Sequence, residues 1–68
     1  MQLADAVIVV LEAAGRPMTI QEIADQCQPY VEDLVSHFTA KQVCMNLFQS
    51  KQVWLVSVDP LMFRWREK

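Results

Sequence analysis

Residues 6–24 read AVIVVLEAAGRPMTIQEIA, and this stretch decides most of the fold prediction. Its first half belongs to an apolar stripe in which aliphatic side chains recur every three or four positions, the spacing of an amphipathic helix. Gly15 supplies a stop at the end of that helix, and Pro17 bars its continuation. We therefore predict a first helix over residues 3–14.

A capping box follows directly. The Thr19 hydroxyl can accept a hydrogen bond from the Glu22 amide, while the Glu22 side chain reaches back to the Thr19 backbone. This spacing predicts a second helix over residues 20–27. The short piece 17–19 before it can be extended and can pair as a small strand.

The middle of the chain carries two further helix signals. Pro29 suits the first position of a helix, and two acids follow in the first turn, so we predict a third helix over residues 29–37. Its apolar stripe would be Tyr30, Val31, Leu34, Val35 and Phe38. Thr39 to Gln42 forms a second capping box, which predicts a helix over residues 39–51. Lys41, Gln42, Met45, Asn46 and Gln49 would face away from the core.

The last third of the chain has strand character. Residues 53–58 are mostly β-branched or aromatic, and Asp59-Pro60 is a turn signal. Residues 61–66 then alternate between apolar and polar side chains. These features predict a two-stranded hairpin, with Leu61, Phe63 and Trp65 on one face and Met62, Arg64 and Arg66 on the other.

Three or four helices followed by a C-terminal hairpin predict a small α+β fold. The 68 residues make one domain spanning 1–68, and a composition that is 53% hydrophobic with a single Gly argues against disorder. The order helix, extended piece, helix, helix, hairpin resembles a winged helix-turn-helix. The stretch 6–24 and the aromatic hairpin are similar to the HARE-HTH domains and to the N-terminal domain of the bacterial RNA polymerase delta subunit, a resemblance that implies a transcription-associated, DNA-binding winged helix.

The charges are segregated along the chain. Residues 1–40 hold six acids and one base, a net charge of −5, whereas residues 41–68 hold five bases and two acids, a net charge of +3. A field divided in this way can guide a polyanion to one face of a protein. The function that we expect first is therefore DNA binding through the 39–51 helix and the hairpin, because Asn and Gln pair with adenine while Lys and Arg contact guanine or phosphate. The expected DNA contacts are Thr39, Lys41, Gln42, Asn46, Gln49, Lys51, Arg64 and Arg66.

A protein-interaction module that does not bind DNA is the alternative. It would dock through an exposed apolar patch. The residues expected in that patch are Ile8, Val9, Met45, Met62 and Trp65. In either case the partner is a macromolecule, DNA or protein, and a homodimer would compensate for the small number of cations.

Other functions find little support in the sequence. Cys27 and Cys44 sit in apolar helical patterns and are interpreted as buried free thiols, and His37 matches no zinc spacing with them. We therefore expect no metal, no cofactor, no small-molecule substrate and no catalytic residue. The longest apolar run is too short to cross a bilayer, so we expect a cytoplasmic protein without a membrane partner.

Overall fold

The first helix has the bounds that the sequence predicts. In the computed structural model, which describes residues 1–67, α1 spans Leu3–Ala14. Gly15 ends it in the left-handed conformation, with φ of 62°, and its backbone N–H donates to the Leu11 carbonyl at 3.3 Å. Only a residue that tolerates positive φ ends a helix in this way at low cost, which is why glycine stands there.

The capping box is confirmed. Strand β1 spans Met18–Thr19 and helix α2 spans Ile20–Cys27. The Glu22 amide donates to the Thr19 hydroxyl, and the Thr19 amide donates to the Glu22 carboxylate, both at 3.2 Å. Arg16 pairs with the same carboxylate at 3.1 Å. The Thr19 amide, followed by Arg16, lowers the pKa of Glu22 below its ordinary value.

The predicted helix over 29–37 is wrong. The chain instead forms a single 3-10 turn, η1 (Gln28–Tyr30), followed by a non-helical segment over residues 31–36, which we call loop 31–36. The Gln28 side chain explains the difference, because its amide nitrogen donates to the carbonyls of Val31 and Asp33 at 3.4 and 2.9 Å and its oxygen accepts from the Val35 amide at 2.8 Å. These bonds give the loop backbone partners that a helix would otherwise supply.

The next helix is shifted toward the N-terminus relative to the prediction of 39–51. Helix α3 spans His37–Gln49, and its N-cap is Ser36, whose hydroxyl accepts from the Thr39 amide at 3.1 Å. Thr39 therefore lies in the first turn. At the other end Lys51 adopts φ of 62°, its amide donates to Phe48, and the Gln52 amide donates to Leu47. This pair of bonds is a Schellman motif with lysine in the place usually taken by glycine. Because the usual glycine is absent, the motif could not be predicted from the sequence.

The hairpin is confirmed and gains a third strand. Strand β2 spans Val53–Val58 and β3 spans Leu61–Trp65, joined through a cis Asp59–Pro60 peptide bond. The antiparallel sheet has the order β1-β3-β2, with Met18 opposite Phe63 and a register shift in β2 between Leu55 and Ser57. The extended piece before α2 thus pairs with β3, as the sequence allowed.

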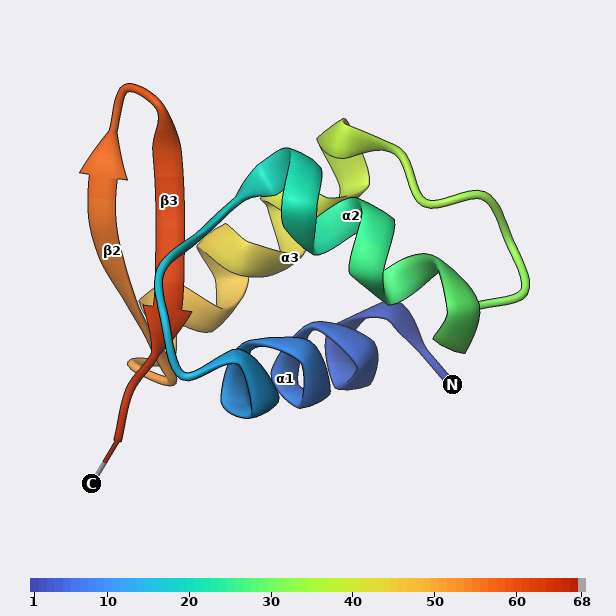
Figure 1. Ribbon diagram of the computed structural model, residues 1–68, viewed down its shortest axis with the longest axis horizontal. Coiled ribbons are helices and arrows are strands. Elements are labelled where there is room, and N and C mark those ends of the chain that lie inside the picture. The colour runs from blue at the N-terminus through green and yellow to red at the C-terminus, as the bar shows by residue number, and fades with distance from the viewer. Residues whose placement is uncertain (68) are drawn as a thin grey trace.

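The three helices and the inner face of the sheet enclose one core. Helix α1 packs against α2, α3 and β3, while α3 also packs against β2. Phe63, Leu11, Met18 and Ile23 are the largest fully buried side chains. Figure 1 shows the hairpin at one end of the long axis of the molecule and loop 31–36 at the other. The hairpin and loop 31–36 therefore form separate surfaces of the molecule.

Candidate functional site

The outward side of α3 is polar beyond the exposed Phe38 in its first turn. Lys41, Gln42, Asn46 and Gln49 are all exposed, and the helix contains no acidic residue. Gln42, Asn46 and Gln49 are spaced by four and three residues, so their side chains share one side of the helix, and Lys41 lies next to Gln42 at its margin. Met45, which lies between them in sequence, is partly buried and packs against the core. The exposed side chains of α3 therefore include four groups that can donate or accept hydrogen bonds without an opposing negative charge.

Thr39, expected to contact DNA at a helix N-terminus, has a structural role. Its hydroxyl donates to the Ser36 carbonyl and its amide donates to the Ser36 hydroxyl. Both groups are used to build the cap of α3. The structure thus places Thr39 on the exposed surface but ties its polar atoms to Ser36.

The basic residues of the hairpin meet an aromatic ring. Arg64 lies directly opposite Trp54 in the sheet register, and the Arg66 guanidinium carbon lies 4.6 Å from the centre of the Trp54 ring. Arg66 also donates to the Lys51 carbonyl at 3.2 Å. Arg64 and Arg66 are thus brought together beside Trp54, and the Lys51 backbone accepts from Arg66. This role of Trp54 was not predicted from the sequence, although alternation along both strands is consistent with it.

The residues expected in an apolar interface are mostly not exposed. Ile8, Met45 and Trp65 pack against the core, and Met62 is half-buried. Val9 is exposed, and with Tyr30 it lines an open hollow of about 510 Å³ between α1 and the end of α2. The large apolar side chains that do reach the surface include Leu34, Phe38, Phe48, Trp54, Val56 and Val58.

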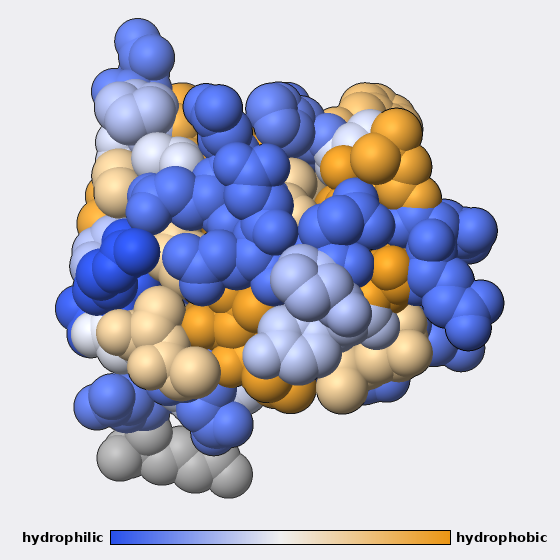
Figure 2. Space-filling view, turned by 45° about the vertical axis from the view of Figure 1, so that its right-hand side comes forward, coloured by the Kyte–Doolittle hydropathy of each residue, from blue (hydrophilic) through white to orange (hydrophobic). Residues whose placement is uncertain are grey.

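Leu34 and Phe38 belong to the apolar stripe predicted for a helix over 29–37, so both were expected to be buried. Instead, Leu34 lies in loop 31–36 and is 89% exposed, Phe38 lies in the first turn of α3 and is 70% exposed, and Val35 stays buried. Figure 2 turns this side of the molecule toward the viewer and shows apolar side chains reaching the surface among hydrophilic ones.

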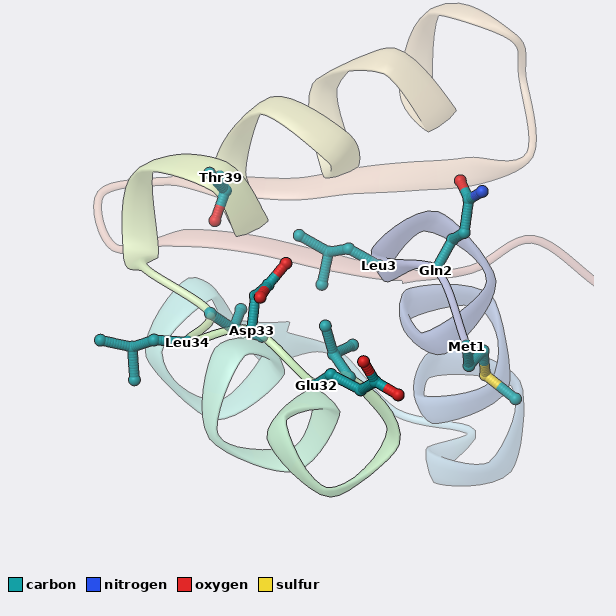
Figure 3. A pocket seen from close by; sticks show the side chains of 9 residues that line it. Met1, Gln2, Leu3, Glu32, Asp33, Leu34 and Thr39 are labelled. Atoms are coloured by element: carbon teal, nitrogen blue, oxygen red, sulfur yellow. The ribbon is translucent and has the colours of Figure 1, made fainter.

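A second hollow, of about 550 Å³, lies between the N-terminal end of α1, loop 31–36 and the start of α3. We call it the loop hollow. Figure 3 shows the Leu3 side chain and the carboxylates of Glu32 and Asp33 directed toward its opening, whereas Leu34 points away from it. The residues that line it are Met1, Gln2, Leu3, Val31, Glu32, Asp33, Leu34, Val35 and Thr39.

The two cysteines are free and buried, as expected. Burial raises the pKa of Cys27 to about 11, and burial together with the neighbouring Cys27 raises the pKa of Cys44 to about 12. Both thiols are therefore protonated near neutral pH, which suppresses nucleophilic chemistry. Across residues 1–67, no three His, Cys, Asp or Glu side chains converge as metal ligands, and no helix has the length and apolarity needed to cross a membrane.

Comparison with family models, with curated proteins and with solved structures finds no match to this chain.

Proposed function

We propose that this chain is a winged-helix domain that binds DNA, with α3 as the helix that enters the major groove. The order α1-β1-α2-α3-β2-β3 and the strand order β1-β3-β2 support this proposal, because they place a hairpin directly after the third helix and join it to the strand that precedes the second. These features agree with the winged-helix resemblance of the sequence.

The single observation that carries the proposal is the outward side of α3. A major groove admits one α-helix, whose exposed side chains meet the edges of the bases. Gln42, Asn46 and Gln49 can each pair with adenine through two hydrogen bonds, and Lys41 can reach guanine or phosphate. An acid at this surface would be repelled by the phosphates, and α3 has none.

The cations available for phosphate contact are few. Lys41, Lys51, Arg64 and Arg66 lie on α3 and the hairpin. If all four neutralise phosphates, the logarithm of the binding constant falls with the logarithm of salt concentration with a slope of about −3 to −4. A monomer would thus bind weakly, and useful affinity requires a dimer or a larger assembly.

A salt-dependent titration tests the proposal. A fluorescent mixed-sequence duplex is titrated with the protein at several salt concentrations, and anisotropy reports binding. We expect Lys41→Glu and Arg64→Glu to abolish binding. The matched control is Ala4→Glu/Ala13→Glu, which makes the net charge more negative by two units, as each charge reversal does, at exposed positions of α1. Equal binding by the control and the charge-reversal variants, or no binding at tens of micromolar in low salt, contradicts DNA binding.

A protein-interaction module is the second candidate function, and strand β2 favours it. β2 lies at the edge of the sheet, contains no charged residue and exposes Trp54, Val56 and Val58. Natural proteins usually protect edge strands with charges, because an unprotected edge can pair with another chain. If this function holds, sedimentation equilibrium will show association that Val56→Lys reverses while DNA binding stays absent.

A further inference from the structure

Loop 31–36 has a defined shape. Three hydrogen bonds from the Gln28 side chain hold it, at its start, its middle and its end. Val31 and Val35 pack against the core below it, so the three residues between them are pushed outward. The exposure of Leu34 therefore follows from a fixed backbone.

That exposure is unfavourable for an isolated domain. A leucine that is 89% exposed leaves nearly all of its apolar surface in water, and Phe38 at the start of α3 does the same over most of its ring. Single exposed apolar residues are common on protein surfaces. Here Leu34 belongs to the lining of a hollow that also includes the aliphatic side chains of Leu3, Val31 and Val35, and Phe38 directly precedes Thr39, another lining residue. Its volume of about 550 Å³ lies within the range of about 300–1,000 Å³ typical of binding sites.

The charged side chains that line the loop hollow are both acidic. Glu32 and Asp33 direct their carboxylates to its opening (Figure 3), and none of its lining residues is Lys or Arg. Two carboxylates at the opening disfavour DNA, because they repel its phosphates. A metal ion is disfavoured as well, since no three ligating side chains converge among residues 1–67.

We propose that the loop hollow binds a cationic amphipathic segment of a partner protein. The segment places an apolar side chain over Leu3, Val31 and Val35, covers Leu34 with another, and sets its Lys or Arg side chains against Glu32 and Asp33. This goes beyond the proposed function and does not depend on it, because α3 and the hairpin offer no part of the site except Thr39.

A second copy of the chain is the competing occupant, since the hairpin is itself basic and apolar around Trp54. The hairpin and loop 31–36 lie at opposite ends of the long axis (Figure 1). Docking of one onto the other is a head-to-tail contact, which generates open filaments unless the rotation happens to close a ring. A separate partner satisfies the same chemistry without polymerisation.

A peptide titration tests the proposal on the full chain. The probe is a synthetic 14-residue peptide of Leu and Lys patterned as an amphipathic helix. Two control peptides carry Glu in place of Lys, or the same Leu and Lys residues in a non-amphipathic order. We expect the probe alone to shift the backbone amide signals of residues 2–5 and 31–39 in ¹H–¹⁵N spectra, and its affinity to fall as salt rises.

Substitutions locate the site. Leu34→Ser should weaken binding of the probe about tenfold or more, and Glu32→Gln/Asp33→Asn should weaken it and flatten its salt dependence. The matched control is Val58→Ser, because Val58 is 76% exposed but lies on the hairpin. Because Leu34 and Val58 are both exposed, neither substitution should unfold the protein, and thermal melts confirm this.

Three results would overturn the proposal. The first is no signal shift at millimolar probe, and the second is equal loss of affinity for Leu34→Ser and Val58→Ser. The third is concentration-dependent association of the protein alone that Leu34→Ser abolishes, which assigns the hollow to a second copy. Duplex titration of Leu34→Ser separates the two functions, since DNA affinity should not change when peptide affinity falls.

Discussion

Gln28 shows how one side chain can redirect a segment of the chain. Its side-chain amide group makes three hydrogen bonds to loop 31–36, and the Val35 N–H that donates to its oxygen is partly buried. Removing a hydrogen-bond partner from a buried amide costs about 1–3 kcal/mol. We therefore expect Gln28→Ala to lower the free energy of unfolding by about this amount, as measured by urea denaturation.

The control for Gln28 lies two residues earlier. Gln26 is exposed on α2, and Gln26→Ala should change stability by less than about 0.5 kcal/mol. Hydrogen exchange gives a second readout, because the Val35 amide should lose protection in Gln28→Ala. Equal stability of the two variants would mean that the loop does not depend on the Gln28 side chain.

At the scale of elements, the sequence predicted α1, α2 and the hairpin but not the region between residues 28 and 39. The correct predictions depend on local chemistry: Gly15 at a helix end, the Thr19–Glu22 box, and alternation in the strands. The failure at 29–37 has a non-local cause, since Gln28 reaches as far as Val35. An apolar stripe and a favourable N-terminus were present, yet neither reports where a glutamine side chain will bond.

The residues of the candidate site were also predicted only in part. Lys41, Gln42, Asn46 and Gln49 are exposed as predicted, because a shift of the helix start leaves the spacing of the residues unchanged. The prediction was wrong for Met45, which packs against the core. The exposure of Leu34 was not predicted because no helix forms over residues 31–36, and that of Phe38 was not predicted because Phe38 belongs to α3 rather than to the predicted helix before it. Trp54 could have been assigned to the basic face from strand alternation, since it pairs with Arg64 across the hairpin.

The N-terminus of α3 offers a test at this scale. The sequence predicts a capping box that begins at Thr39, but the structure uses Ser36 as the N-cap. Ser36→Ala should lower the free energy of unfolding by about 0.5–2 kcal/mol, the usual value of an N-cap, in thermal or urea denaturation. Thr39→Ala removes only a hydroxyl inside the first turn and should cost less. A larger loss of stability for Thr39→Ala than for Ser36→Ala would place the start of the helix at Thr39.

At the scale of the whole molecule, the charges that are segregated along the sequence are also separated in space. The acidic residues of loop 31–36 and the basic residues of the hairpin lie at opposite ends of the long axis (Figure 1). Opposite charges at two distant ends can attract two different partners, because salt screens each end from the charge of the other. The proposed DNA surface and the proposed peptide site are therefore compatible in one 68-residue chain.

The core that joins these ends can be probed through its thiols. Cys27 and Cys44 are fully buried in the same cluster, and burial raises the pKa of Cys27 to about 11 and that of Cys44 to about 12. An unfolded cysteine has a pKa of about 8.5, so the native state holds its thiol protons more tightly. Stability should consequently fall as the pH rises from about 8.5 toward 11, because the unfolded state then releases protons that the folded state keeps.

The same burial predicts slow modification. At pH 8 the reaction of native protein with a disulfide reagent such as 5,5′-dithiobis(2-nitrobenzoate) should be at least about 100-fold slower than in guanidinium, since it requires opening of the core to expose a thiolate. Mass spectrometry of the partly labelled protein should find both cysteines modified at similar rates, because one opening event exposes both. Rapid labelling of Cys27 alone would instead show that α2 and loop 31–36 open as a separate unit. Loop 31–36 would then be mobile, which would contradict a preformed peptide site.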